Sequence, residues 1–350
     1  MRSKIFIILG IAAFIPLGAM AGTADRFTRC SLIEDDTARL KCYDDVSGRP
    51  AKAPGTDTSS GSLAATAIPE KAPREAVKPP DGTYPTGASV LARQWDLDEA
   101  NRARKFVIKP YRSNYILPVA YNNSPNTDSS LDLDPDAKPQ HTEAKFQISF
   151  KVKLWEDIFG RDMDLWFGYT QLAFWQVYNT AFSSPFRETN YEPELLLNFR
   201  TDYDLFGLRG KMINIGLNHQ SNGRSGPLSR SWNRVVANFG FERDQFNVLL
   251  RTWYRIPENK RDDDNPDIEK YSGYGELWGH YFWKKQRFGM MVRNNLRSDN
   301  KGAIQLEWAF PLIEHISAYL QYFNGYGESL IDYNKCVNRF SIGFLLTDWY

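Results

Sequence analysis

From residue 105 to the C-terminus, apolar and polar residues alternate in one segment after another. In residues 145–154, phenylalanine, isoleucine, valine and leucine fill the even positions, and lysine, glutamine and serine fill the odd positions. A β-strand turns every second side chain to the same face, so this pattern predicts a strand with one apolar face. About twelve such segments follow one another: 106–117, 145–154, 165–177, 194–200, 208–221, 231–241, 247–255, 271–283, 288–297, 303–312, 316–323 and 338–350.

The N-terminus has the parts of a secretory signal peptide. Arg2 and Lys4 precede the apolar run 5–17, and Ala19 and Ala21 form a small-x-small cleavage site. The run is too short for a membrane anchor, and no later stretch approaches the roughly 20 apolar residues of a spanning helix. If the exported chain resides in a membrane, it must therefore cross it as a closed barrel.

The sequence predicts three parts: a signal peptide (1–21), a periplasmic extension with a flexible linker (22–104) and a β-barrel (105–350). In the extension, Cys30 and Cys42 flank a short polar segment and could form a disulfide in an oxidising compartment. Metal binding by two cysteines without a nearby histidine is the weaker alternative. The linker is rich in proline, alanine, serine, threonine and glycine, as flexible spacers are.

The connections between the expected strands alternate between short turns and long loops, which is typical of outer-membrane barrels. With the N-terminus in the periplasm, the loop 222–230 falls on the cell-surface side. A soluble β-sandwich is the alternative, but it rarely combines this loop asymmetry with a signal peptide. We therefore expect an all-β fold, a twelve-stranded antiparallel transmembrane barrel in the bacterial outer membrane. A net charge of +1 without a basic tract argues against a nucleic-acid partner.

Two neighbouring segments place a histidine, a serine and an asparagine on their apolar faces. His219 and Ser221 share the face of 208–221 that is otherwise apolar, and Asn233 does the same in 231–241. A serine hydroxyl becomes a nucleophile when a base lies within hydrogen-bond reach, and a third group commonly orients that base. An asparagine can orient a histidine without placing a full charge at the lipid boundary. A His-x-Ser pair by itself is common, and a polar strand end is the alternative.

Three ordered strings resemble the outer membrane phospholipase A family. They are SSPFRETNYEP (183–193), HQSNGR with SRSWNR (219–224 and 229–234), and GYGESLIDYN (325–334). The resemblance covers about residues 105–350 and leaves the extension outside. It implies a twelve-stranded barrel that hydrolyses acyl esters of phospholipids, with phospholipase A1, phospholipase A2 and lysophospholipase activity. It also implies calcium dependence and activity as a homodimer.

The resemblance further implies a role for each site residue. Ser221 is the nucleophile, His219 the base and Asn233 the group that orients it. The oxyanion donor is the backbone N–H of Gly223, for which a turn glycine is the alternative interpretation. The implied calcium ligands are the Arg224 carbonyl, the Ser229 hydroxyl and Ser183 from the partner subunit.

Other polar residues have structural as well as functional interpretations. Gly226 stands where an acidic residue is expected, which argues against a secondary calcium site. The run 262–264 consists of three aspartates and is best interpreted as a solvated surface loop. Gln171 lies on a lipid-facing stripe, where an amide needs a partner, and this predicts a dimer interface, with snorkelling to the membrane interface as the alternative. A catalytically silent structural barrel or channel is the alternative function, but a channel would place its functional residues inward rather than outward.

Overall fold

The computed structural model describes residues 29–30, 32–33, 35–47, 89–127, 139–313 and 316–347. The chain divides into two units, residues 1–75 and 76–350, which are described separately. The described part of the first unit contains helix α2 (Asp36–Ser47) and the disulfide between Cys30 and Cys42. The expected signal peptide and most of the expected linker lie outside the described residues.

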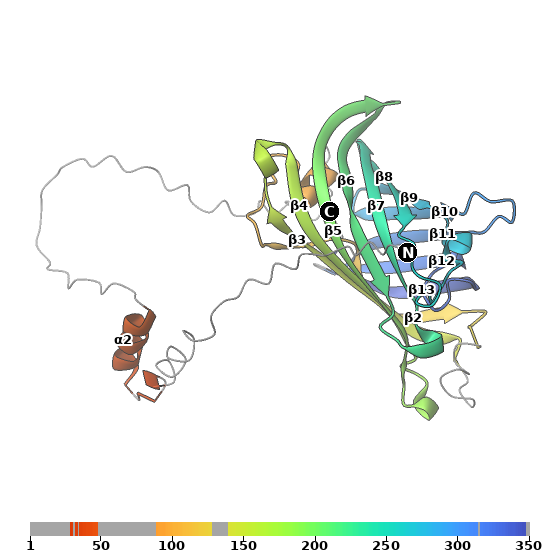
Figure 1. Cartoon of the computed structure of the whole chain (residues 1–350), viewed down its shortest axis with the longest axis horizontal. Helices are drawn as coiled ribbons and strands as arrows, with labels where there is room; N and C mark the ends of the chain where they lie inside the picture. The colour runs from red at the N-terminus through yellow and green to blue at the C-terminus, as the bar shows by residue number, and fades with distance from the viewer. Residues whose placement is uncertain are drawn as a thin grey trace, which may run out of the picture. The chain divides into compact units, whose positions relative to one another are not determined.

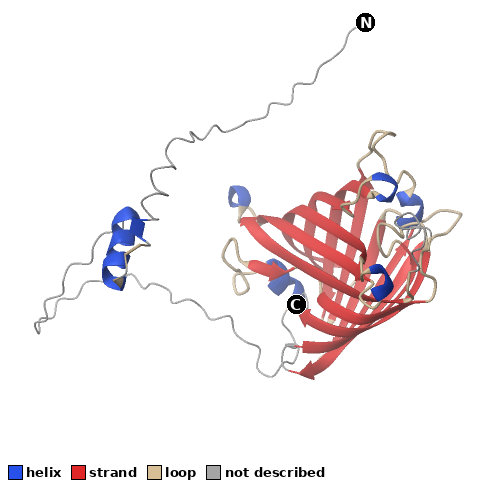
Figure 2. Cartoon of the chain, turned by 90° about the horizontal axis from the view of Figure 1, so that it is seen from below, coloured by secondary structure: helices blue, strands red, loops and turns tan. Residues whose placement is uncertain are grey.

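The second unit is a β-barrel (Figures 1 and 2). Strands β2 to β13 each pair antiparallel with their neighbours in sequence, and β13 pairs with β2, which closes a ring of twelve. A short strand, β1 (Ile108–Pro110), pairs with the part of β3 that lies beyond the pairing of β3 with β2. The barrel strands are β2 (Asn114–Asn122), β3 (Thr142–Trp155), β4 (Met163–Trp175), β5 (Phe186–Leu205), β6 (Leu208–Ser221), β7 (Ser231–Arg243), β8 (Phe246–Arg255), β9 (Gly275–Trp283), β10 (Gln286–Asn294), β11 (Gly302–Ile313), β12 (Ile316–Tyr326) and β13 (Cys336–Thr347).

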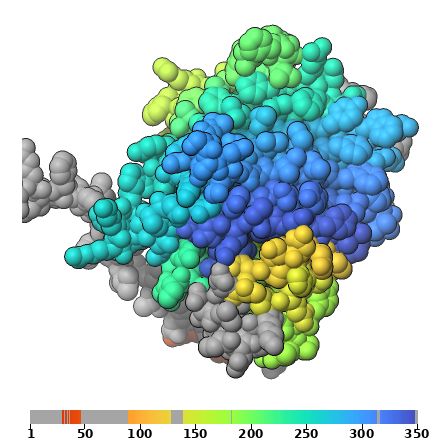
Figure 3. All heavy atoms as spheres, turned by 90° about the vertical axis from the view of Figure 1, so that its right-hand side faces the viewer, coloured from red at the N-terminus to blue at the C-terminus, as the bar shows by residue number. Residues whose placement is uncertain are grey.

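The closing seam joins the two ends of the barrel sequence. Phe340 on β13 pairs with Tyr121 on β2, and the pairing continues to Thr347 opposite Asn114. Figure 3 shows this seam from outside, with the dark blue C-terminal strand beside the yellow N-terminal segment. The expected twelve-stranded antiparallel barrel is therefore confirmed.

The alternation along each strand separates an outer from an inner face. On β6, Ile215 and Leu217 are 47% and 56% exposed, whereas Asn214 and Asn218 are 0% and 3% exposed. Outward apolar and inward polar side chains are the arrangement of a barrel that meets lipid on its outside. Among the described residues, no helix is long and apolar enough to cross a membrane.

Three strand predictions were wrong in detail. The expected strand 194–200 is only the middle of β5, which starts at Phe186. The first half of β5 was missed because its charged side chains face the barrel interior and obscure the alternation of apolar and polar residues. The expected strand 106–117 is two strands, β1 and β2, and the expected strand 271–283 starts only at Gly275. The expected strand 288–297 ends at Asn294, and Arg297 lies beyond it, next to Asp299.

In the described residues, the barrel unit contains two α-helices and three 3-10 helices. Helix α3 (Val90–Trp95) lies inside the barrel, where its Leu91 and Trp95 pack with Trp166 and Met212. Ser89 caps its N-terminus by accepting from Ala92 N and donates to Glu242 at the end of β7. The remaining pieces are α5 (Ile268–Ser272) and the 3-10 helices η2 (Ile158–Gly160), η3 (Thr180–Phe182) and η4 (Gly226–Leu228).

Candidate active site

His219 and Ser221 lie at the C-terminal end of β6, on its outer face. They have the same parity as the exposed Ile215 and Leu217, so they point away from the barrel interior. The register places His219 opposite Asn233 on β7 and Ser221 opposite Ser231. The structure thus brings the histidine, the serine and the asparagine together on the surface that faces lipid.

A direct contact joins His219 to Asn233. Their Nδ1 and Oδ1 atoms are 2.8 Å apart. A carbonyl oxygen only accepts hydrogen bonds, so this contact requires a hydrogen on Nδ1 and leaves Nε2 as the unprotonated nitrogen. Unprotonated Nε2 is the nitrogen that a general base uses to take a proton from a serine hydroxyl. Each side chain is half-buried, which leaves room for a substrate to approach from the lipid side.

Gly223 starts the loop after β6 in the left-handed region of backbone conformation, with φ +66°. A methyl group at this position would lie 3.1 Å from Cε2 of Tyr191, so both the backbone and the neighbouring ring favour glycine. The side chain of Asn222 holds the loop in shape: it donates to Leu228 O and accepts from Arg230 N. The sequence analysis assigned no role to Asn222, although a buried asparagine beside a turn glycine commonly shapes a loop.

The three expected calcium ligands lie in two neighbouring loops at the same end of the barrel. Arg224 and Ser229 belong to the loop between β6 and β7, and Ser183 ends η3 in the loop between β4 and β5. Ser183 is exposed, whereas the hydroxyl of Ser184 donates to Val177 O within its own loop. Ser183 is therefore the better placed of the two serines to reach a second molecule.

The donor set around Ser229 suits a hard cation. The Ser229 hydroxyl donates to Asp264 Oδ2, so a carboxylate adjoins the proposed hydroxyl ligand. Calcium prefers oxygen ligands of this kind, including carbonyls and hydroxyls. Within the described residues, no group of three or more histidine, cysteine, aspartate or glutamate side chains could hold a metal. The run 262–264 is exposed only in part: Asp263 pairs with Arg255, and Asp264 links the run to Ser229, a contact that the sequence did not predict.

Gln171 lies on β4 at the height of the site. It pairs with Tyr191 on β5, which in turn pairs with Ser221 on β6. Because adjacent strands are about 4.8 Å apart, Gln171 and Ser221 are separated by roughly 10 Å across the barrel wall. The hydroxyl of Tyr169 donates to Gln171 Oε1 at 3.2 Å, which leaves the amide N–H₂ available to a further acceptor.

Known proteins resemble this chain over the barrel and beyond. The phospholipase A1 family model matches residues 91–346. The chain belongs to the phospholipase A1 family. A relative in Neisseria meningitidis is 34% identical over 99% of this chain and 96% of its own length. Phospholipase A1 of Klebsiella pneumoniae is 40% identical over 70% of this chain and 84% of its own length.

Two solved structures of this family have the same fold. Outer membrane phospholipase A from Escherichia coli matches with a TM-score of 0.66 and 38% identity, covering 70% of this chain and all of that chain. The Salmonella typhi outer membrane phospholipase, a dimer with bound calcium, matches with a TM-score of 0.68 and 36% identity, covering 75% of this chain and 98% of that chain. The phospholipase A1 barrel described here is accordingly an outer-membrane protein. The family match begins at residue 91, so it includes α3, which the resemblance starting near residue 105 left out.

A further acidic residue adjoins the site in this phospholipase A1 family member. Glu258, in the connection between β8 and β9, accepts a hydrogen bond from Asn233 Nδ2 at 2.9 Å. In this connection the sequence predictions covered only the run 262–264 and not Glu258. The parity of the strand was a usable signal, because Tyr254 and Ile256 point outward and Glu258 continues their alternation.

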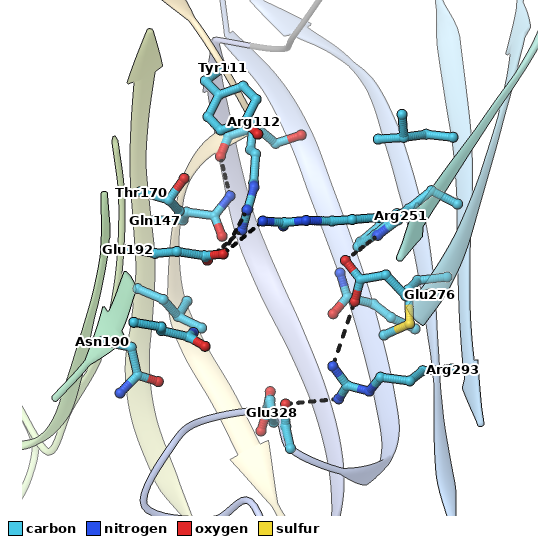
Figure 4. A pocket seen from close by; sticks show the side chains of 18 of the residues that line it. Tyr111, Arg112, Gln147, Thr170, Asn190, Glu192, Arg251, Glu276, Arg293 and Glu328 are labelled. Carbon is cyan, nitrogen blue, oxygen red and sulfur yellow. Dashed lines mark hydrogen bonds and ion pairs between the residues drawn. The ribbon is translucent and has the colours of Figure 1, made fainter. Parts of the chain in front are cut away.

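The inner face beneath the site is filled by a network of charged side chains (Figure 4). Glu192 on β5 accepts from Arg112, Arg234 and Arg251, and Glu194 pairs with Arg112 and Arg251. Buried charges are tolerated when they are paired in this way. The interior encloses a cavity of about 220 Å³ among these side chains. The interior thus consists of interlocked ion pairs around this cavity.

Proposed function

We propose that this protein hydrolyses the acyl ester bonds of phospholipids with Ser221 as the nucleophile. The observation that supports this most is the 2.8 Å contact between His219 Nδ1 and Asn233 Oδ1, on the lipid-facing surface and two residues from Ser221. In the neutral ring this contact leaves Nε2 without a hydrogen, and Ser221 lies on the same strand face. A substrate ester in the outer leaflet can meet this surface without leaving the membrane.

The reaction follows from these atoms. His219 Nε2 takes the proton of Ser221 as its Oγ attacks the ester carbonyl carbon. The tetrahedral oxyanion is stabilised by the backbone N–H of Gly223. The carbon–oxygen bond to the glycerol then breaks, and His219 returns the proton to the departing alkoxide. Water attacks the acyl-enzyme with the same base, which releases a fatty acid and restores the serine.

The residues near Gly223 fit a calcium ion. Arg224 supplies a carbonyl, Ser229 a hydroxyl next to Asp264, and Ser183 of a second copy of the chain a further hydroxyl. When bound, calcium supplies positive charge that polarises water and stabilises the oxyanion. The side chain of Arg224 keeps its loop in place by donating to Arg187 O at 2.6 Å.

The active form in this proposal is a homodimer. Gln171 and Ser221 lie at the same level along the barrel axis on the outer surface. A second copy of the chain that docks against Gln171 therefore also reaches the site. The amide of Gln171 finds its further acceptor in the second copy, where no water competes. Dimerisation thereby brings Ser183 of one copy to the calcium ligands of the other.

We further propose that both acyl positions and lysophospholipids are accepted, because the site lies open on the barrel wall rather than in a deep pocket. The alternative is a catalytically silent barrel or channel. The interlocked ion pairs inside the barrel speak against wide conduction.

The test is phospholipid hydrolysis by the detergent-refolded full chain, with calcium and with excess chelator. We expect fatty acid release that requires calcium and is lost in Ser221→Ala. Ser225→Ala, an exposed serine in the adjacent loop, is the matched control and should keep wild-type activity. Equal release from Ser221→Ala, or none from the folded dimer, would refute the assignment, and conductance in planar bilayers would then test the channel.

A further inference from the structure

Asn233 has two polar neighbours, one at each end of its amide. Its Oδ1 lies 2.8 Å from His219 Nδ1, and its Nδ2 lies 2.9 Å from Glu258 Oε1. The backbone supports this arrangement, because Ile256 N donates to Asn233 O at 2.8 Å and so continues the pairing of β8 with β7. Glu258 follows two residues later on the same outer face.

The chemistry of these neighbours determines which way the amide points. An ionised carboxylate only accepts hydrogen bonds, so it must face the N–H₂ end of the amide. The carbonyl end is then directed at His219, and it can accept only from an N–H. If the amide turned over, its N–H₂ would face Nδ1 and favour the tautomer with a hydrogen on Nε2. That tautomer cannot take a proton from Ser221.

We propose that Glu258 is a positioning residue of the active site, which fixes the amide of Asn233 so that its oxygen faces His219. The hydrogen bonds then run from Glu258 through Asn233 to His219, which lies two residues from Ser221 on the same strand face. The negative charge of Glu258 also polarises the amide and favours the imidazolium that forms as Ser221 attacks. This inference rests on the proposed serine mechanism and adds a fourth member to it.

Glu258 also explains why an amide, rather than a carboxylate, stands at position 233. An aspartate there would place two carboxylates about 2.9 Å apart, because Asn233 Nδ2 occupies the position of the second oxygen. Two ionised carboxylates at such a distance repel, and one must take up a proton or move away. An asparagine is able to donate to Glu258 and accept from His219 at the same time.

The first experiment compares kcat and KM of Glu258→Ala and Glu258→Gln in the full chain, refolded and dimeric. Glu258→Ala should lower kcat on the order of 10- to 100-fold, the size expected for losing a hydrogen bond to a charged group, with KM unchanged. Glu258→Gln should lose less, because its Oε1 can still accept from Asn233. Glu269→Gln, in the same connection between β8 and β9, is the matched control. Wild-type kcat in Glu258→Ala would overturn the proposal.

Double variants test whether Glu258 acts through Asn233. In the Asn233→Ala background, Glu258→Ala should cause no further loss, whereas fully multiplicative losses would contradict a shared pathway. Asn233→Asp should be poorly active, and adding Glu258→Gln should restore activity by removing the repulsion. A merely structural role of Glu258 predicts no such rescue, so failure of the rescue would overturn the inference.

A covalent probe separates this inference from the proposed function. A fluorophosphonate should label the wild type at Ser221, located by mass spectrometry, with no need for a lipid substrate. Labelling of Glu258→Ala at the wild-type rate would overturn the positioning role alone. Absence of Ser221 labelling in the folded wild type would overturn both the nucleophile and the positioning role.

Discussion

Substituting Glu192 by glutamine should strongly destabilise the barrel, because this carboxylate is the common partner of three arginines. Its oxygens lie 2.9 Å from Arg112 and Arg251 and 3.1 Å from Arg234, and its side chain is only 8% exposed. With Glu194, three arginines and two glutamates give this cluster a net charge of +1. Glutamine keeps the size of the side chain but raises the net charge of the cluster to +2.

The magnitude follows from the burial of these partners. The side chains of Arg234 and Arg251 are 5% and 7% exposed, so their charges are largely removed from bulk water. Removing one partner from a buried ion pair typically costs about 3–5 kcal/mol. We expect Glu192→Gln to lower the free energy of unfolding by about this amount, measured by urea unfolding in detergent micelles with tryptophan fluorescence as the signal.

The control is Asp202→Asn, which removes a charge from an exposed pair with Arg209. Exposed pairs contribute little to stability, so the unfolding curve of this variant should overlay that of the wild type. An unfolding free energy for Glu192→Gln within error of the wild type would show that the interior ion pairs are not a source of barrel stability. The reasoning would then be refuted, whatever happened to activity.

Gly223→Ala should reduce kcat on the order of 10- to 100-fold while the barrel stays folded, because alanine is strained at φ +66° and its methyl group would press on Tyr191, which displaces the backbone N–H. A wild-type kcat would show that the reaction does not depend on the backbone geometry that glycine provides at this position. Ser229→Ala should raise the calcium concentration needed for half-maximal activity, and an unchanged calcium titration would remove this hydroxyl from the ligand set. The barrel should lose stability in acid, in part through Asp332 in the loop between β12 and β13. Burial alone would raise the pKa of the Asp332 carboxyl, but the Arg187 guanidinium 2.8 Å away holds that pKa below its ordinary value. Its contribution to stability is therefore complete above about pH 4 and is lost as the pH falls through the lowered pKa, so Asp332→Asn should show a weaker fall in unfolding free energy below about pH 4 than the wild type.

The sequence predicted the barrel because the alternation along its strands has a direct physical cause. Where one face meets lipid and the other meets polar partners, apolar residues occur at every second position, as in β6. The first half of β5 escaped prediction because it belongs largely to the polar interior, where Arg187, Glu188 and Glu192 find their partners on other strands and in a loop. Parity places Glu258 on the outer face, but its contact with Asn233 escaped because the two residues are 25 positions apart and no local pattern reports a contact of that range.

The interior network and the lipid-facing site are held in register by the same pair of strands. Arg234 donates to Asn218 Oδ1 at 2.9 Å on the inner face, and these residues are the immediate neighbours of Asn233 and His219 on the outer face. Asn218 also donates to Glu192, which ties the inner contact to the buried cluster of charges. A slip of one residue between β6 and β7 would turn Asn233 inward and Arg234 into lipid, so the cost of exposing that charge opposes the slip. The buried ion pairs therefore serve the chemistry on the opposite face of the wall, because they fix the register that brings Asn233 to His219.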